Sequence, residues 1–140
     1  MILLLDSSTL IYRFEGTPAI QAAAAAHIAE LAQGAPSATL AVSRLSLLEC
    51  RVKPLREGDG GLLARYDAWF ATVSRIVELD AAVVGAATLL RARHGLKTPD
   101  ALVAACALSL PSPRVLVSGD AGFQRVPGLQ ASCITLPTGA

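Results

Sequence analysis

The sequence predicts an α/β fold in which helices cover both faces of a central parallel sheet, a three-layer α/β/α architecture. Short apolar runs, beginning with Ile2 to Leu5, alternate along the chain with longer segments of helical periodicity, and this alternation is typical of βαβ units. The apolar runs are continuous, as expected for strands that are buried on both faces. A length of 140 residues fits one domain over residues 1–140.

The first half of the chain contains two predicted strands and four predicted helices. In order they are strand Ile2–Leu5, helix Ser8–Glu15, helix Ala19–Gln33, strand Thr39–Val42, a helix from Ser43 to about Val52, and an amphipathic helix through Leu62, Tyr66, Phe70 and Val73. Gly34 and Pro36 supply the stop of the second helix. The third is expected to end before Pro54, because proline lacks the backbone N–H that a helix interior needs.

The second half continues the alternation. It contains strand Arg75–Leu79, helix Ala81–His94, a helix from Pro99 to Leu110 with Thr98 as its N-cap, strand Val115–Val117, and a short strand Cys133–Leu136. Gly95 is expected to end the first of these helices, since glycine is the common residue just after a helix. Pro99 suits a first helical turn.

Composition limits the class of protein. With 53% hydrophobic and 4% aromatic residues, the core must be built from alanine, leucine and valine. Cys50, Cys106 and Cys133 are far apart and odd in number, so we expect three buried free thiols in a reducing compartment. No stretch approaches the ~18 apolar residues of a membrane span, and MILLL is too short for a signal peptide. We therefore expect a soluble, cytoplasmic protein.

Four acidic residues stand where a parallel sheet collects its functional groups. Asp6 directly follows the first strand and Asp120 follows the fourth, and active sites of open parallel sheets lie at the carboxyl ends of strands. Glu49 lies in the helix after the second strand, and Asp100 lies in the first turn of the helix that begins at Pro99. Each acid alone has an ordinary interpretation as a cap or a solvated side chain; the four together indicate a site.

A convergent carboxylate cluster would require a cation. Two like charges about 4 Å apart repel by roughly 4 kcal/mol at an effective dielectric constant near 20. Oxygen ligands without histidine or cysteine favour a hard ion, Mg²⁺ or Mn²⁺. Setting the four aside leaves seven of the eleven acidic residues against twelve basic ones, a net charge of +5. An acidic pocket on an otherwise basic body suits a polyanionic substrate.

The sequence resembles the PIN-domain ribonucleases, specifically the toxins of VapC type. Four segments carry the resemblance in order: LLLDSSTLI around Asp6, SRLSLLECRV around Glu49, HGLKTPDALVAACAL around Asp100, and VLVSGDAGFQRV around Asp120. The resemblance implies a parallel sheet of strand order 3-2-1-4-5, homodimers, one or two Mg²⁺ or Mn²⁺ ions, endonucleolytic cleavage of RNA, and a small cognate antitoxin. Gly119 stands where the family usually has asparagine, and Ser46 where threonine is common.

The expected mechanism is hydrolysis of RNA phosphodiester bonds by a metal-activated water. In this hypothesis Asp6, Asp100 and Asp120 hold the metal, and Glu49 binds a second ion or orients the water. Ser7, Ser46 and Ser118 are expected to orient carboxylates or waters, with Ser7 and Ser8 in the turn that aims Asp6. Arg51 and Lys53, one turn beyond Glu49, are candidate RNA contacts; a solvated helix end is their alternative interpretation.

Three alternatives remain open from the sequence. A PIN fold that has lost activity would serve as a binding module, although the presence of all four acids argues against it. A haloacid-dehalogenase phosphatase or phosphotransferase also begins with an aspartate at a strand end, but it would need a second aspartate at position 8, which is serine. A receiver domain would need a late lysine after a strand, and Lys97 is the last lysine of the chain.

Overall fold

The fold is built around a five-stranded parallel sheet. The computed structural model describes residues 1–138. The strands are β1 (Ile2–Leu5), β2 (Thr39–Ser43), β3 (Arg75–Val77), β4 (Arg114–Ser118) and β5 (Ala131–Cys133). They lie in the order β3-β2-β1-β4-β5, and every neighbouring pair is parallel. In the register of the central strand, Ile2 pairs with Thr39 on one side and with Arg114 on the other. The predicted strand order is confirmed.

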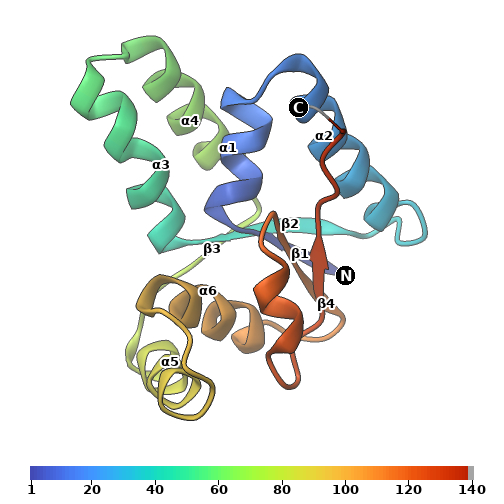
Figure 1. The fold of residues 1–140 in the computed structure, drawn as a ribbon, viewed down its shortest axis with the longest axis vertical. Coiled ribbons are helices and arrows are strands. Elements are labelled where there is room, and N and C mark those ends of the chain that lie inside the picture. The colour runs from blue at the N-terminus through green and yellow to red at the C-terminus, as the bar shows by residue number, and fades with distance from the viewer. Residues whose placement is uncertain (139–140) are drawn as a thin grey trace.

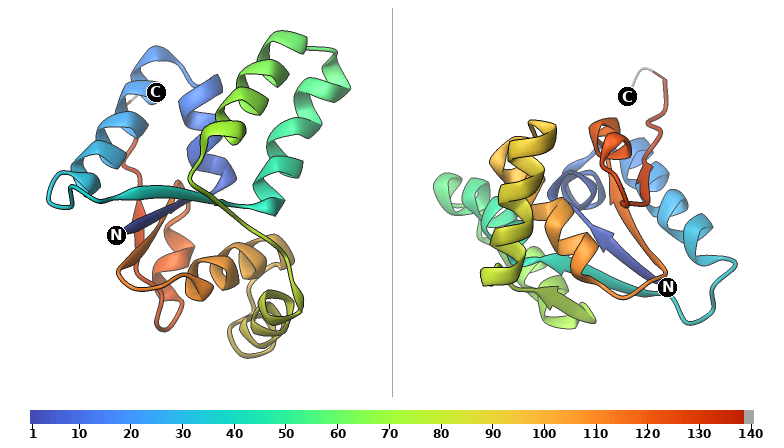
Figure 2. Two further views of the ribbon diagram at one scale, coloured as in Figure 1. Left: turned by 180° about the vertical axis from the view of Figure 1, so that it is seen from behind. Right: turned by 90° about the horizontal axis from the view of Figure 1, so that it is seen from below.

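Helices cover the sheet on both faces (Figure 1). They are α1 (Ser7–Glu15), α2 (Pro18–Ala32), α3 (Arg44–Glu57), α4 (Gly60–Thr72), α5 (Ala81–His94), α6 (Thr98–Ser109) and the short 3₁₀ helix η1 (Ala121–Arg125). Figure 1 shows α1 to α4 above the sheet and α5 and α6 below it; Figure 2 shows the same layers from behind and from below. Among residues 1–138, no helix has the length and apolar character needed to cross a bilayer.

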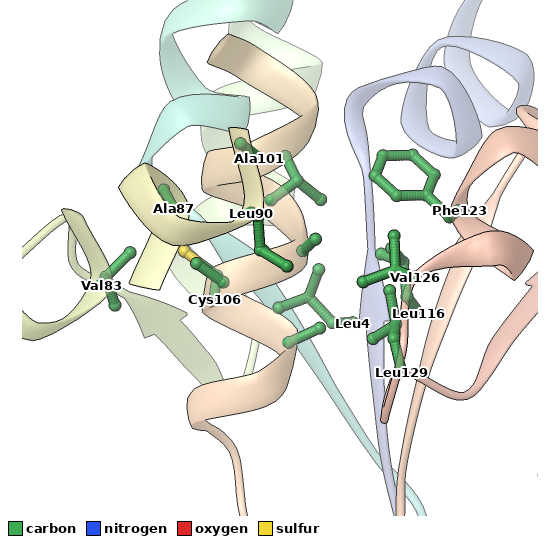
Figure 3. Close-up of a cluster of buried hydrophobic side chains, with 14 of the residues drawn as sticks. Leu4, Val83, Ala87, Leu90, Ala101, Cys106, Leu116, Phe123, Val126 and Leu129 are labelled. Carbon is green, nitrogen blue, oxygen red and sulfur yellow. The ribbon is translucent and has the colours of Figure 1, made fainter. Parts of the chain in front are cut away.

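The two faces of β1 bury different cores. Leu3 and Leu5 pack toward α1, α2 and α4, where Tyr66 and Phe70 are buried, whereas Leu4 faces the opposite layer. This division follows from the alternation of side chains along a strand. On the Leu4 side, the cluster runs from α5 and α6 to the segment after β4 (Figure 3). Phe123, Val126 and Leu129 belong to this cluster, so η1 and the residues that follow it pack against the same core as α6. This packing positions η1 at the carboxyl edge of the sheet.

Helix α3 extends further than the sequence predicted. It was expected to end near Val52, but it continues through Pro54 to Glu57 and ends at Gly58, whose φ of 68° is left-handed. Proline removes one backbone hydrogen bond of a helix, yet Pro54 is itself buried, so its ring contributes to the packing of α3. Burial of the proline offsets the missing bond, and the predicted boundary was wrong.

Three smaller predictions also need correction. Thr98 is the first residue of α6 and Lys97 is the N-cap; the Thr98 hydroxyl instead accepts a hydrogen bond from Arg91 Nη1 at 3.0 Å. The fifth strand lies at Ala131–Cys133 rather than Cys133–Leu136, because Ser132 and Cys133 pair with the end of β4. Strand β3 stops at Val77, two residues early.

The cysteines are free, but they are not all buried as expected. Cys50 and Cys106 are buried and Cys133 is half-buried. Burial, together with the nearby Glu49, raises the pKa of Cys50 to about 12, so this thiol stays neutral at physiological pH. Cys50 and Cys106 therefore act as small apolar core residues.

Candidate functional site

Asp6 is a buried carboxylate at the carboxyl end of the central strand. Its side chain is only 7% exposed. Oδ1 accepts hydrogen bonds from Thr9 N at 3.0 Å, which caps α1, and from Ser8 Oγ at 2.7 Å. Oδ2 accepts a short hydrogen bond from Ser118 Oγ at the end of β4. Burying a charge requires such partners. The interpretation of Asp6 as a helix cap is confirmed through Oδ1, and its part in a metal site stays a prediction.

A chain of hydroxyls connects Asp6 with the backbone that carries Asp120. Ser118 Oγ accepts a hydrogen bond from Asp120 N at 2.9 Å, and Ser8 Oγ accepts one from Gly119 N at 2.9 Å. The Asp120 carboxylate is exposed, and its Oδ1 caps η1 by accepting from Gly122 N at 2.8 Å. Two carboxylates from strands that neighbour each other in the sheet are thus held in a fixed relation through Ser8 and Ser118.

Glu49 reaches the same edge of the sheet from α3. Ser7 Oγ donates to Glu49 Oε1 at 2.7 Å and lies 3.2 Å from the Oγ of Ser46, which is fully buried one helical turn earlier. Glu49 itself is half-buried. Because Ser7 directly follows Asp6, the hydroxyl bridge brings α3 to the same edge of the sheet as Asp6.

Asp100 and Asp120 line one hollow beside η1. The hollow has a volume of about 60 Å³, and its walls are Leu96, Asp100, Asp120, Gly122, Phe123 and Arg125. The pKa of the Asp100 carboxyl is raised, first by burial and then by the charge of Asp120, with a further contribution from Asp6. Lys97 and Arg125 act in the opposite direction. Asp120 and Asp6 therefore lie near enough for their charges to act on Asp100.

The four acids lie along one edge of the sheet, but they do not form a tight cluster. In the part of the chain that the structure describes, no three His, Cys, Asp or Glu side chains stand close enough together to make a preformed metal site. The donor set itself fits a hard cation, since it consists of carboxylate and hydroxyl oxygens. Asp100 and Asp120 would contact such an ion because both line the same hollow. Asp6 would contribute Oδ2, which here accepts the hydrogen bond from Ser118 Oγ.

The two basic residues singled out by the sequence already have partners. Arg51 Nε lies 3.0 Å from Asp67 Oδ1, a charge contact that lacks hydrogen-bond geometry. Lys53 Nζ donates to Glu15 Oε1 at 2.9 Å. Both pairs connect α3 with neighbouring helices. An RNA contact by Arg51 or Lys53 remains a prediction, and it would compete with these pairs.

The structure adds two residues that the sequence analysis missed. Thr9 is fully buried, and its hydroxyl donates to Val117 O at 2.8 Å while lying 3.1 Å from Asp6 Oδ1. The sequence signal for Thr9 is its place three residues after a helix N-cap. Arg125 lines the acidic hollow. Its only sequence signal is its position five residues after Asp120, which places it near the acids once η1 forms.

The family assignment follows from comparison with known proteins. The model of the PIN domain family matches residues 3–129, nearly the whole chain, so the chain belongs to the PIN domain family. The fold agrees with the resemblance drawn from the sequence. A search of curated proteins gives no match.

Solved structures with the same fold come from toxin–antitoxin complexes. VapBC2 from Rickettsia felis, crystallised with a DNA fragment from its promoter, has a TM-score of 0.77 at 19% identity over 96% of this chain and 100% of that chain. VapBC-1 from nontypeable Haemophilus influenzae has a TM-score of 0.68 at 21% identity, covering 95% and 98%. A toxin–antitoxin complex from Klebsiella pneumoniae has 0.68 at 23%, covering 91% and 94%. At these identities the likeness establishes the fold.

Proposed function

We propose that this protein is a metal-dependent endoribonuclease and the toxin of a VapC-type toxin–antitoxin pair. The observation that carries the proposal is the edge of a PIN-family sheet where Ser118 connects Asp6 with the Asp120 backbone, Ser7 holds Glu49, and Asp100 shares a hollow with Asp120. PIN domains of VapC toxins are generally nucleases, and this chain has an acidic residue at each of the four positions that the resemblance implies.

Each group has a distinct part in the proposed reaction. Asp100, Asp120 and Asp6 would hold one or two Mg²⁺ or Mn²⁺ ions. Bound metal would neutralise charge on the phosphoryl oxygens and acidify water. Glu49, held by Ser7, orients the attacking water. Ser8 and Ser118 fix the Asp6 carboxylate by hydrogen bonds and so reduce the reorganisation that metal binding requires.

The proposal includes two protein partners. The first is a small antitoxin, since the structures that share this fold are VapBC and other toxin–antitoxin complexes. The second is another copy of this chain. Large apolar side chains stand exposed on α3 and α5, the helices at the β3 side of the sheet in Figure 1. They are Leu48, Val52, Leu55, Val84 and Leu89. On α3, Leu48, Val52 and Leu55 line one hollow, and apolar side chains that gather in this way mark contact sites.

Substitution of Asp6 by asparagine tests the reaction. Asparagine is as good an N-cap as aspartate, and the Ser118 hydroxyl can accept from an amide as well as donate, so the fold should survive. Cleavage of a fluorescent RNA in Mg²⁺ should fall by more than about 100-fold, because losing a group that merely orients a ligand costs roughly 10- to 100-fold. The cleavage rate and the thermal midpoint are measured together.

The matched control is Asp80→Asn. Asp80 caps α5 with the same geometry, accepting from Val83 N at 2.9 Å, but it takes no part in the acidic edge, so cleavage should stay at the wild-type rate. EDTA should stop cleavage by both the wild type and this control. Undiminished Mg²⁺-dependent cleavage by Asp6→Asn would refute the proposed mechanism. A wild-type chain that leaves total cellular RNA intact in both Mg²⁺ and Mn²⁺ would establish the inert binding module instead.

A further inference from the structure

A positively charged side chain also lines the hollow of Asp100 and Asp120. Arg125 lies on η1 and forms part of the same wall. Its Nη1 donates to His94 O at the end of α5, at 2.9 Å. This bond fixes the guanidinium between η1 and α5 and uses one of its five N–H donors.

The remaining donors of Arg125 have no protein partner among residues 1–138. The ion pairs in this range are Arg44–Glu78, Arg51–Asp67 and Lys53–Glu15, so no carboxylate lies within ion-pair distance of Arg125. The side chain is exposed, and buried Phe123 and Val126 hold the η1 segment that carries it against the core. A positioned arginine with free donors is thus presented at the acidic hollow.

We propose that Arg125 is a substrate-binding residue that contacts a backbone phosphate of the RNA strand. This inference rests on the proposed function and names the group that receives the polyanion at that site. Guanidinium groups bind phosphate oxygens through paired, charge-assisted hydrogen bonds. The phosphate is the one adjoining the scissile phosphate, because Asp100 and Asp120 occupy the hollow and would exclude an anion there unless metal is bound. Arg125 therefore contributes to binding more than to the chemical step.

The inference is tested by measuring the binding of a short fluorescein-labelled single-stranded RNA in EDTA. Every protein in this test carries Asp6→Asn, so that neither cleavage nor metal enters the measurement. Arg125→Gln should weaken binding about tenfold, the range expected for one charge-assisted hydrogen-bonded contact. The slope of log Kd against log salt should fall by about 0.7, the value for one phosphate contact on a single strand. Arg125→Lys should keep the slope and bind with intermediate affinity, since lysine retains the charge without the paired donors.

The matched control is Arg93→Gln on α5. Arg93 is exposed and has no hydrogen bond or ion pair in the described structure, so the substitution removes the same charge from a neighbouring element. Equal effects of the two glutamine variants on affinity and slope would overturn the inference. With active protein, Arg125→Gln should raise KM more than it lowers kcat, and the reverse pattern would also overturn it. If the wild type fails to cleave RNA but Arg125 still governs its binding, the proposed function falls while the Arg125 contact stands.

Discussion

At the residue scale, the site depends on close packing between α1 and the loop before Asp120. A Cβ atom added to Gly119 would lie 2.6 Å from both Cε2 and Oη of Tyr12. The Tyr12 ring thus fills the space that a side chain at position 119 would need. This explains physically why glycine stands where the PIN resemblance leads one to expect asparagine, a departure that the sequence revealed but did not explain.

Gly119→Ala tests this packing. The added methyl group must displace the Tyr12 ring, and overpacking typically costs about 1–3 kcal/mol in the free energy of unfolding. Gly85→Ala is the matched control, since a Cβ at that helical position meets nothing within 4 Å, and alanine should stabilise the helix by roughly 0.5–1 kcal/mol. Urea unfolding measures both. Combining Gly119→Ala with Tyr12→Ala should remove the clash, and a strictly additive double variant would contradict the packing argument.

At the element scale, the types of helices and strands followed from the sequence, and the details that depend on tertiary contacts did not. The Ile2–Leu5 strand and the end of α5 at Gly95, whose φ is 66°, follow from local chemistry. The passage of α3 through Pro54 does not, because it depends on burial of that ring. Asp6 and Asp120 were placed at one edge because both follow strands of a parallel sheet, whereas Thr9 and Arg125 acquire their roles only from the packing of α1 and η1.

The N-cap of α5 gives a prediction at this scale. Asp80→Ala removes the acceptor of Val83 N, and loss of an N-cap typically costs about 1 kcal/mol. Asp80→Asn keeps the acceptor and should cost much less. Chemical denaturation of both variants provides the comparison. If the two destabilise equally, the charge of Asp80 matters rather than its hydrogen bond.

At the scale of the whole molecule, the apolar side chains on α3 and α5 bear on assembly. Leu48 is 60% exposed, and a hollow of about 450 Å³ lies beside it, walled by residues of α3 and by Leu79. A second copy of the same surface would cover both the projecting side chains and the hollow, as in the isologous interfaces of two-fold dimers.

Leu48→Glu should therefore convert the proposed dimer into a monomer, because a charge would be buried at the interface without a partner. Light scattering coupled to size exclusion measures the mass. Leu136→Glu is the control, as Leu136 is exposed and apolar but lies outside α3 and α5. A wild type with the mass of one chain, or a Leu48→Glu variant that keeps the mass of two, would rule this interface out.

The register of β1 has a consequence for synthesis of the protein. Ile2 pairs with Thr39 on one side, but its partner on the other side is Arg114. During synthesis, β1 therefore stays unpaired along one edge until β4 has left the ribosome. Pairing of two strands so far apart in the sequence is slow. A chain that terminates prematurely before Asp120 has neither the complete sheet nor the complete acidic edge. The proposed activity thus appears only when translation is nearly finished, so incomplete chains are expected to lack it.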